Sequence, residues 1–115
     1  MPATIDNDVC NEFVECSLGF SSASRVYSSL IGNYCADVST GKKYWAFIRV
    51  MGRGSGHLAL SCALSTAINH VILAEEVDAK KLCLRDIVDG ICELIIARSR
   101  AGKDYGAVLI PEGLI

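Results

Sequence analysis

The sequence has 115 residues, of which 51% are apolar, with 10 glycines and a net charge of -2. This apolar content excludes an intrinsically disordered chain, and the length allows one hydrophobic core rather than two. Its 13 acidic and 11 basic residues are interspersed, so no basic stripe indicates a nucleic-acid partner. No apolar run reaches the roughly 20 residues of a membrane-spanning helix, and no basic, apolar signal peptide opens the chain. We therefore expect neither membrane insertion nor secretion.

The mean hydropathy of +0.36 is high for a soluble domain of this size, and the chain closes on the apolar Ile115. We expect residues 1–115 to form one partial domain of a longer protein. The six cysteines have irregular spacings with no C-x-x-C pair, which disfavours a zinc site. Most of them stand in apolar runs, as Cys62 and Cys83 do. We expect them to be small buried side chains with reduced thiols, in a cytoplasmic protein.

The first third of the chain predicts a helix over residues 12–38 with a break near Gly19, because it contains no proline and only two glycines. Gly41 and Lys42 then end the segment. Residues 44–50 are mostly aromatic or β-branched and lie between a lysine pair and a glycine cluster, which predicts a strand. One apolar stripe at helical spacing runs along the predicted helix, formed by Val26, Leu30, Ile31 and Tyr34.

The rest of the chain alternates between helix and strand. A glycine turn at 52–56 precedes a short helix over 58–67, a strand over 71–74 and a polar connection. A helix from 84 to 98 follows, and a strand over 107–110 closes the pattern. Short apolar strands separated by helices predict the α/β class, with a layered parallel sheet and flanking helices. The apolar stripe of the last helix consists of Ile87, Ile91, Leu94 and Ile95, continued by Arg98.

Ligands of an open parallel sheet bind beyond the carboxyl ends of its strands. Three segments satisfy that description, and we expect them on one edge: residues 51–56, Glu75 with Glu76, and residues 111–113. Arg53, in the first segment, offers a planar fork of donors that suits phosphoryl oxygens. A solvated loop arginine is the alternative.

Two familiar motifs fit this glycine turn poorly. Gly52, Gly54 and Gly56 follow a strand as in a dinucleotide-binding fingerprint, but His57 stands where its last glycine belongs. Ser55 cannot be a nucleophile elbow, because Arg53 and His57 occupy the two positions that must be glycine. We expect His57 to begin a helix or to pack rather than to act as a base.

The segment from Thr4 to Asp8 places two carboxylates, Asp6 and Asp8, on either side of Asn7. Asp8 can cap a following helix and favour its positive end. Alternatively, one carboxylate takes a proton from a hydroxyl group while a nearby arginine neutralises a transferring group. These residues alone leave both interpretations open.

Four segments in register resemble the central part of phosphofructokinases, and the resemblance runs the whole length. They are PATIDND at 2–8, KYW at 43–45, MGR at 51–53 and IPEGLI at 110–115. The chain is most similar to the long pyrophosphate-dependent group. The resemblance implies the phosphofructokinase fold, a Rossmann-like layered parallel sheet. It also implies glycolytic phosphorylation of the 1-hydroxyl of fructose 6-phosphate, a need for Mg²⁺, and an oligomer of identical or related chains.

The resemblance further implies a role for each matching residue. Asp6 would accept the proton of the sugar 1-hydroxyl, and Thr4 would contact that hydroxyl or the phosphoryl group. Asp8 would support Asp6 and the magnesium ion, while Arg53 would bridge the sugar and the transferring phosphoryl group. The remaining sugar contacts would be Met51, Gly52 and Glu112 in the same subunit, with Lys43 and Tyr44 reaching a neighbouring subunit's site.

One position departs from the pyrophosphate-dependent pattern. Those members usually carry a lysine just before the Thr-Ile-Asp run, whereas Ala3 is the small residue that ATP-using members often show. The donor implied is thus pyrophosphate or ATP. The donor-binding glycine-rich loop lies outside residues 1–115, so we expect these residues alone to turn over nothing. The alternatives are a catalytically silent regulatory subunit, which intact Asp6 disfavours, and an unrelated dinucleotide-binding half-domain, which His57 disfavours.

Overall fold

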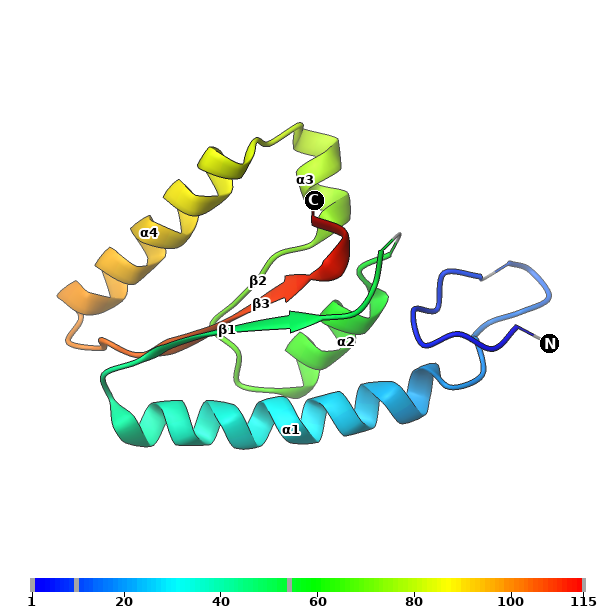
Figure 1. The fold of residues 1–115 in the computed structure, drawn as a ribbon, viewed down its shortest axis with the longest axis horizontal. Helices are drawn as coiled ribbons and strands as arrows, with labels where there is room; N and C mark the ends of the chain where they lie inside the picture. Colours follow the sequence, from blue (N-terminus) through cyan, green and yellow to red (C-terminus); the bar gives the residue numbers. More distant parts are fainter. Residues whose placement is uncertain (1, 10, 54, 115) are drawn as a thin grey trace.

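The computed structural model describes residues 2–9, 11–53 and 55–114 (Figure 1). Helices and strands alternate along most of this length, which confirms the predicted α/β class. In chain order the elements are α1 (Phe20–Gly41), β1 (Trp45–Val50), α2 (His57–Ser65), β2 (His70–Val71), α3 (Ala74–Lys80), α4 (Leu84–Arg100), β3 (Gly106–Pro111) and the 3-10 turn η1 (Glu112–Leu114).

The three strands form one parallel sheet in the order β1-β3-β2. Trp45 pairs with Gly106 and Val50 pairs with Pro111, so β1 and β3 run in register and end together. The short β2 pairs with β3 at Val108 and Leu109. The loop after β1 and the turn after β3 consequently leave the sheet at the same edge, as predicted.

The core lies between the sheet and helices α1 and α2, which cover one of its faces (Figure 1). Leu58 and Cys62 of α2 have no exposed surface and pack against Ile31 of α1 and against Val50 and Leu109 of the strands. Truncating a fully buried leucine to alanine costs roughly 2–5 kcal/mol of stability. These contacts fix the sheet edge from which the candidate site is built.

The first helix begins later than predicted, at Phe20 rather than near residue 12. Gly19 stands at its N-terminus with a φ of 98°, a left-handed conformation that favours glycine. Before it, the backbones of Asn11 and Val14 bond each other in a tight turn, with both N···O distances 3.1 Å. Asp8 therefore caps no helix, and the capping interpretation of this carboxylate was wrong.

The predicted apolar stripe of α1 is also not the face that packs inward. Ile31 and Val38 are buried, and Tyr27 and Cys35 beside them are half-buried, so the packed face follows a different set of helical spacings. Both faces of this helix are apolar, which is why the sequence pattern misled. Three members of the predicted stripe are more than half exposed: Val26, Leu30 and Tyr34.

The segment after α2 departs from the sequence prediction as well. The strand expected over 71–74 is only His70–Val71. Helix α3 begins at Ala74, the last residue of that predicted strand, and takes up most of the predicted polar connection. Two glutamates in the first turn of α3 and Lys80 in its last turn suit the helix dipole. Local charge placement thus favours helix in a stretch whose apolar pattern is weak.

The cysteines are less buried than predicted. Cys62 is buried and Cys35 half-buried, and burial raises the pKa of both thiols. Cys10 lies outside the described residues. The other three are exposed, so the expectation of buried side chains was wrong for Cys16, Cys83 and Cys92. All five described cysteines are free thiols.

Helix α4 matches its predicted range and runs on the side of the sheet opposite α1 (Figure 1). Asp86 accepts the backbone N–H of Cys83 at 3.0 Å and its thiol at 3.1 Å, which closes a capping box and lowers the pKa of Asp86. The predicted apolar stripe of α4 is half-buried. Within the described ranges, no helix has both the length and the apolar composition to cross a membrane.

Candidate active site at the carboxyl edge of the sheet

The loop after β1 and the turn after β3 are joined at the sheet edge. The N–H of Gly113 donates a hydrogen bond of 3.0 Å to the carbonyl oxygen of Gly52. A Cβ atom on Gly113 would overlap the carbonyl oxygen of Arg53, so the two backbones approach too closely for any other residue. Gly52 itself has a φ of 132°. Glycines thus allow the Arg53 loop to lie directly on η1.

Arg53 and Glu112 face each other across this junction. Their Nε and Oε1 atoms are 3.5 Å apart, with side chains 85% and 28% exposed. So exposed a pair adds little to stability. The pair matters instead for orientation, because the Glu112 carboxylate holds the Arg53 guanidinium while the other donors of that guanidinium remain available beyond the sheet edge.

The N-terminal segment lies beyond the arrowhead of β1 (Figure 1). Its Asp6 is bonded there to Ser55 of the loop after β1. The N–H of Asp6 donates to Oγ1 of Thr4 at 3.3 Å, and its carbonyl oxygen accepts the hydroxyl of Ser55 at 2.8 Å. The carboxylate atom Oδ1 is buried with no hydrogen-bond partner among the described residues. Buried polar atoms nearly always have partners, so an unpaired carboxylate oxygen at this edge marks Asp6 as a candidate functional residue.

Asn7 fixes the turn that carries Asp6. It is buried, its φ is 54°, and its Oδ1 accepts the N–H of Ser17 at 2.9 Å. The N–H of Leu18 donates to the carbonyl of Pro2 at 3.0 Å and closes the segment into a loop. Asparagine tolerates the left-handed conformation better than most residues. Asp8, the neighbour on the other side, is exposed.

Met51 and Glu112 line a cleft of about 330 Å³ beside this junction. A cavity of this size lies within the range of small-molecule sites. Sequence reasoning missed Tyr27 and Arg49, which line it together with Val50. Tyr27 precedes Ile31 by one helical turn, but the burial of Ile31 that would single it out is known only from the structure.

Two predicted site groups lie elsewhere. Lys43 and Tyr44 are exposed and precede β1, so they stand at the opposite edge of the sheet from Arg53. Within one chain the structure does not bring them to Asp6. Glu75, in contrast, lies beside the 51–56 segment as predicted, where it accepts the backbone N–H of Gly56 at 2.5 Å and thereby holds the start of α2. His57 is the first residue of α2, which confirms its predicted place at a helix start.

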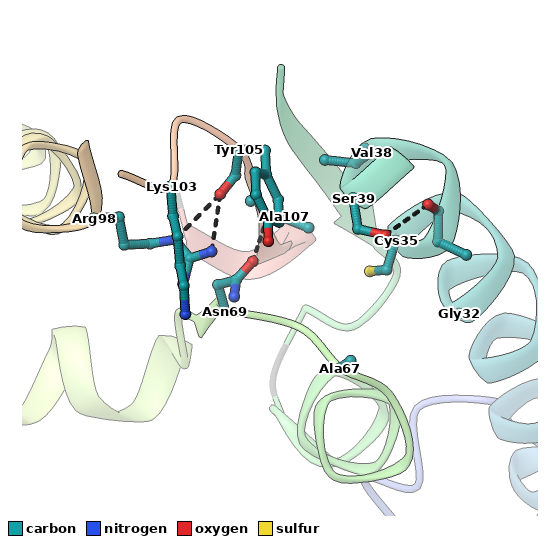
Figure 2. A pocket seen from close by; sticks show the side chains of 12 residues that line it. Gly32, Cys35, Val38, Ser39, Ala67, Asn69, Arg98, Lys103, Tyr105 and Ala107 are labelled. Carbon is teal, nitrogen blue, oxygen red and sulfur yellow. Dashed lines mark hydrogen bonds between the residues drawn. The ribbon is translucent and has the colours of Figure 1, made fainter. Parts of the chain in front are cut away.

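Figure 2 shows a second cavity, of about 370 Å³, at the amino ends of the strands. Here Arg98 donates from Nε and Nη2 to the carbonyl oxygen of Tyr105 at 3.1 and 3.0 Å, and its guanidinium lies 5.7 Å from the ring centroid of Trp45. Asn69 accepts the N–H of Ala107 at 2.9 Å. These bonds tie α4 and the start of β2 to β3.

The comparisons with known proteins agree with the family resemblance found in the sequence. The profile described as Phosphofructokinase matches residues 1–115, the whole chain. The chain belongs to the phosphofructokinase family. A whole-length match to this family sets aside the alternative of an unrelated dinucleotide-binding half-domain.

Two relatives of this family illustrate the match. The pyrophosphate–fructose 6-phosphate 1-phosphotransferase of Treponema pallidum is 48% identical over 115 residues, which are 100% of this chain and 20% of that protein. The Arabidopsis thaliana protein named subunit alpha 2 of the same enzyme is 46% identical, over 100% of this chain and 19% of its own. The chain thus spans about a fifth of the length of its curated relatives.

A solved structure confirms the fold. Phosphofructokinase of Pichia pastoris in the T-state superimposes with a TM-score of 0.78 at 20% identity, over 99% of this chain and 12% of that chain. The predicted Rossmann-like layers of the family are therefore present in this segment.

The family's implied magnesium ion has partial support from the residues at this edge. Among the residues that the structure describes, no group of three or more histidine, cysteine or acidic side chains forms a metal cluster. Magnesium is commonly held by one or two carboxylates, several waters and substrate phosphates, so few protein ligands suffice. Asp8, whose side chain is exposed, offers one such carboxylate.

Proposed function

We propose that residues 1–115 are the sugar-phosphate-binding central portion of an enzyme that phosphorylates the 1-hydroxyl of fructose 6-phosphate, giving fructose 1,6-bisphosphate. The observation that carries this proposal is the buried, unpartnered Oδ1 of Asp6 in a turn bonded to the Arg53 loop. A carboxylate that accepts a proton and a guanidinium that stabilises phosphoryl charge are two groups that phosphoryl transfer uses. Family membership supports the same reaction.

In this proposal each loop makes one contribution. Asp6 takes the proton of the 1-hydroxyl as that oxygen attacks the terminal phosphoryl group of the donor, and Thr4 contacts the same hydroxyl or the phosphoryl group. Arg53 stabilises the charge spread over the phosphoryl oxygens. Glu112 orients Arg53 and accepts hydrogen bonds from sugar hydroxyls. Positioning and electrostatic stabilisation account for most of the rate enhancement.

The sugar would lie against the backbone of Gly52 and the side chain of Met51, which lines the cleft beside Glu112. Asp8 would support Asp6 and the Mg²⁺ ion near the donor. When bound, the ion neutralises charge on the donor's phosphates. The donor-binding glycine-rich loop belongs to the part of the protein outside residues 1–115, so this segment alone turns over nothing.

Oligomerisation is part of the proposal. Lys43 and Tyr44 are exposed at the edge of the sheet away from Asp6, and we assign them to the sugar phosphate in a neighbouring subunit's site. The name of the Arabidopsis relative, subunit alpha 2, supports an assembly of identical or related chains. The free thiols of the described cysteines are compatible with the reducing cytoplasm, where we place the protein.

The donor is tested most simply with the full-length protein. We propose pyrophosphate, because the similar relatives are named for it, although Ala3 is typical of ATP users. The assay compares phosphorylation of fructose 6-phosphate by pyrophosphate and by ATP at matched concentrations, with magnesium present. Faster turnover with pyrophosphate is expected. Faster turnover with ATP would assign donor choice to Ala3, and inactivity with both would favour a catalytically silent subunit.

A further inference from the structure

Ser55 makes a hydrogen bond between the two loops that carry Asp6 and Arg53. The side chain is only 8% exposed, and its Oγ donates to the carbonyl oxygen of Asp6 at 2.8 Å across 49 positions of sequence. Thr4 accepts the N–H of the same aspartate. The main chain of Asp6 is therefore held on both sides, while its Oδ1 has no partner among the residues that the structure describes.

The loop that carries Ser55 is itself anchored at both ends. Before Ser55, the carbonyl of Gly52 accepts the N–H of Gly113, and after it, the N–H of Gly56 donates to the carboxylate of Glu75. A short hydrogen bond from a buried hydroxyl on an anchored loop limits where its acceptor can move. The position of Asp6 is consequently set relative to the loop that holds Arg53.

We propose that Ser55 is a positioning residue that sets the Asp6 carboxylate relative to Arg53 for phosphoryl transfer. The proposal rests on the base role proposed for Asp6. Ser55 touches neither substrate nor donor in this account, and its hydroxyl acts through the backbone of Asp6. Misplacing a reacting group by about 1 Å can lower a rate by about 10²-fold, so one such bond is sufficient to matter.

The test compares four variants of the full-length protein with the parent: Ser55→Ala, Asp6→Asn, the double variant and Ser65→Ala. Ser65 is the matched control, because its Oγ also donates to a backbone carbonyl, that of Ser61 at 2.9 Å, within α2. Ser55→Ala should lower kcat by about 10- to 100-fold and change the KM for fructose 6-phosphate less than about twofold. Ser65→Ala should match the parent.

The double variant separates positioning from a general structural effect. If Ser55 acts through Asp6, Ser55→Ala should cause no further loss of kcat in the Asp6→Asn background. An equal further loss there would overturn the proposal, and so would parental kcat in Ser55→Ala while Asp6→Asn is impaired. Parental rates in Asp6→Asn would overturn the function proposed for Asp6, and this inference with it.

Discussion

At the scale of single residues, the site depends on a carboxylate oxygen that folding buries without a partner. Asp6 and Asp8 look equivalent in the sequence, yet Asp8 is exposed whereas Oδ1 of Asp6 is enclosed and has no hydrogen-bond partner in the described part of the chain. An unsatisfied buried oxygen costs stability, typically about 1–3 kcal/mol. The base role proposed for Asp6 would explain why such a cost is tolerated.

Arg53 should contribute to both binding and chemistry. Replacing it by alanine removes a charged donor fork from the sheet edge, so kcat should fall while the KM for fructose 6-phosphate rises. The loss in kcat/KM should be about 10²- to 10³-fold, as for other groups that stabilise developing charge. Steady-state kinetics of the full-length protein measure it, with the exposed Arg100→Ala as a control. A change in KM alone would make Arg53 a ground-state contact.

At the scale of elements, the site is a junction of loops at the end of a parallel sheet. In-register pairing of β1 and β3 brings their following residues together, and the backbone bond between Gly113 and Gly52 fixes them. The segment before α1 adds Asp6 to this junction through Ser55. The close approach of the two backbones makes the junction sensitive to a single methyl group.

Gly113→Ala should disrupt this junction. The added Cβ overlaps the carbonyl of Arg53, so the loop must shift, at a cost of about 1–3 kcal/mol in the free energy of unfolding and with loss of activity. Gly90→Ala in α4 is the control, because a methyl group there meets open space and should raise helix stability by about 0.5–1 kcal/mol. Denaturant unfolding measures the stability of each variant, and kcat/KM measures its activity. Equal behaviour of the two variants would contradict the account.

The sequence predicts the parallel layers because the spacing of apolar residues and the glycine, proline or lysine residues at the ends of the elements agree over β1, α4 and β3. The prediction fails where two patterns compete. Both faces of α1 are apolar, so nothing local distinguishes the packed Tyr27 from the exposed Val26. The loop before α1 lacks proline and glycine at its centre, yet a buried Asn7 in a left-handed turn shapes it. Hydrogen bonds such as that between Ser55 and Asp6 depend on tertiary structure, so the spacing of residues in the sequence cannot predict them.

At the scale of the whole molecule, the segment presents only part of a site. It spans about a fifth of its relatives' length, and Lys43 and Tyr44 lie at the edge of the sheet away from Asp6. In the function proposed above, those two side chains serve the site of a neighbouring subunit. On that proposal, a complete site would combine the rest of the chain with a neighbouring copy or related chain.

Mixing two impaired variants tests this arrangement. Full-length Asp6→Asn and Tyr44→Ala proteins should each be weakly active as pure oligomers. When subunits are exchanged between them, some sites combine an intact Asp6 with an intact Tyr44 from the neighbour, so activity should rise above that of either parent. Activity that stays at the average of the two after exchange would place Tyr44 outside the neighbouring site.

The central claim is that Asp6 is the base for phosphorylation of fructose 6-phosphate, and its most direct test is kcat of the full-length Asp6→Asn variant. Asparagine preserves size and the backbone bonds to Thr4 and Ser55 while it removes the proton acceptor. With magnesium and the better donor, kcat should fall by about 10²- to 10⁴-fold with little change in sugar KM. A variant as fast as the parent would contradict the account.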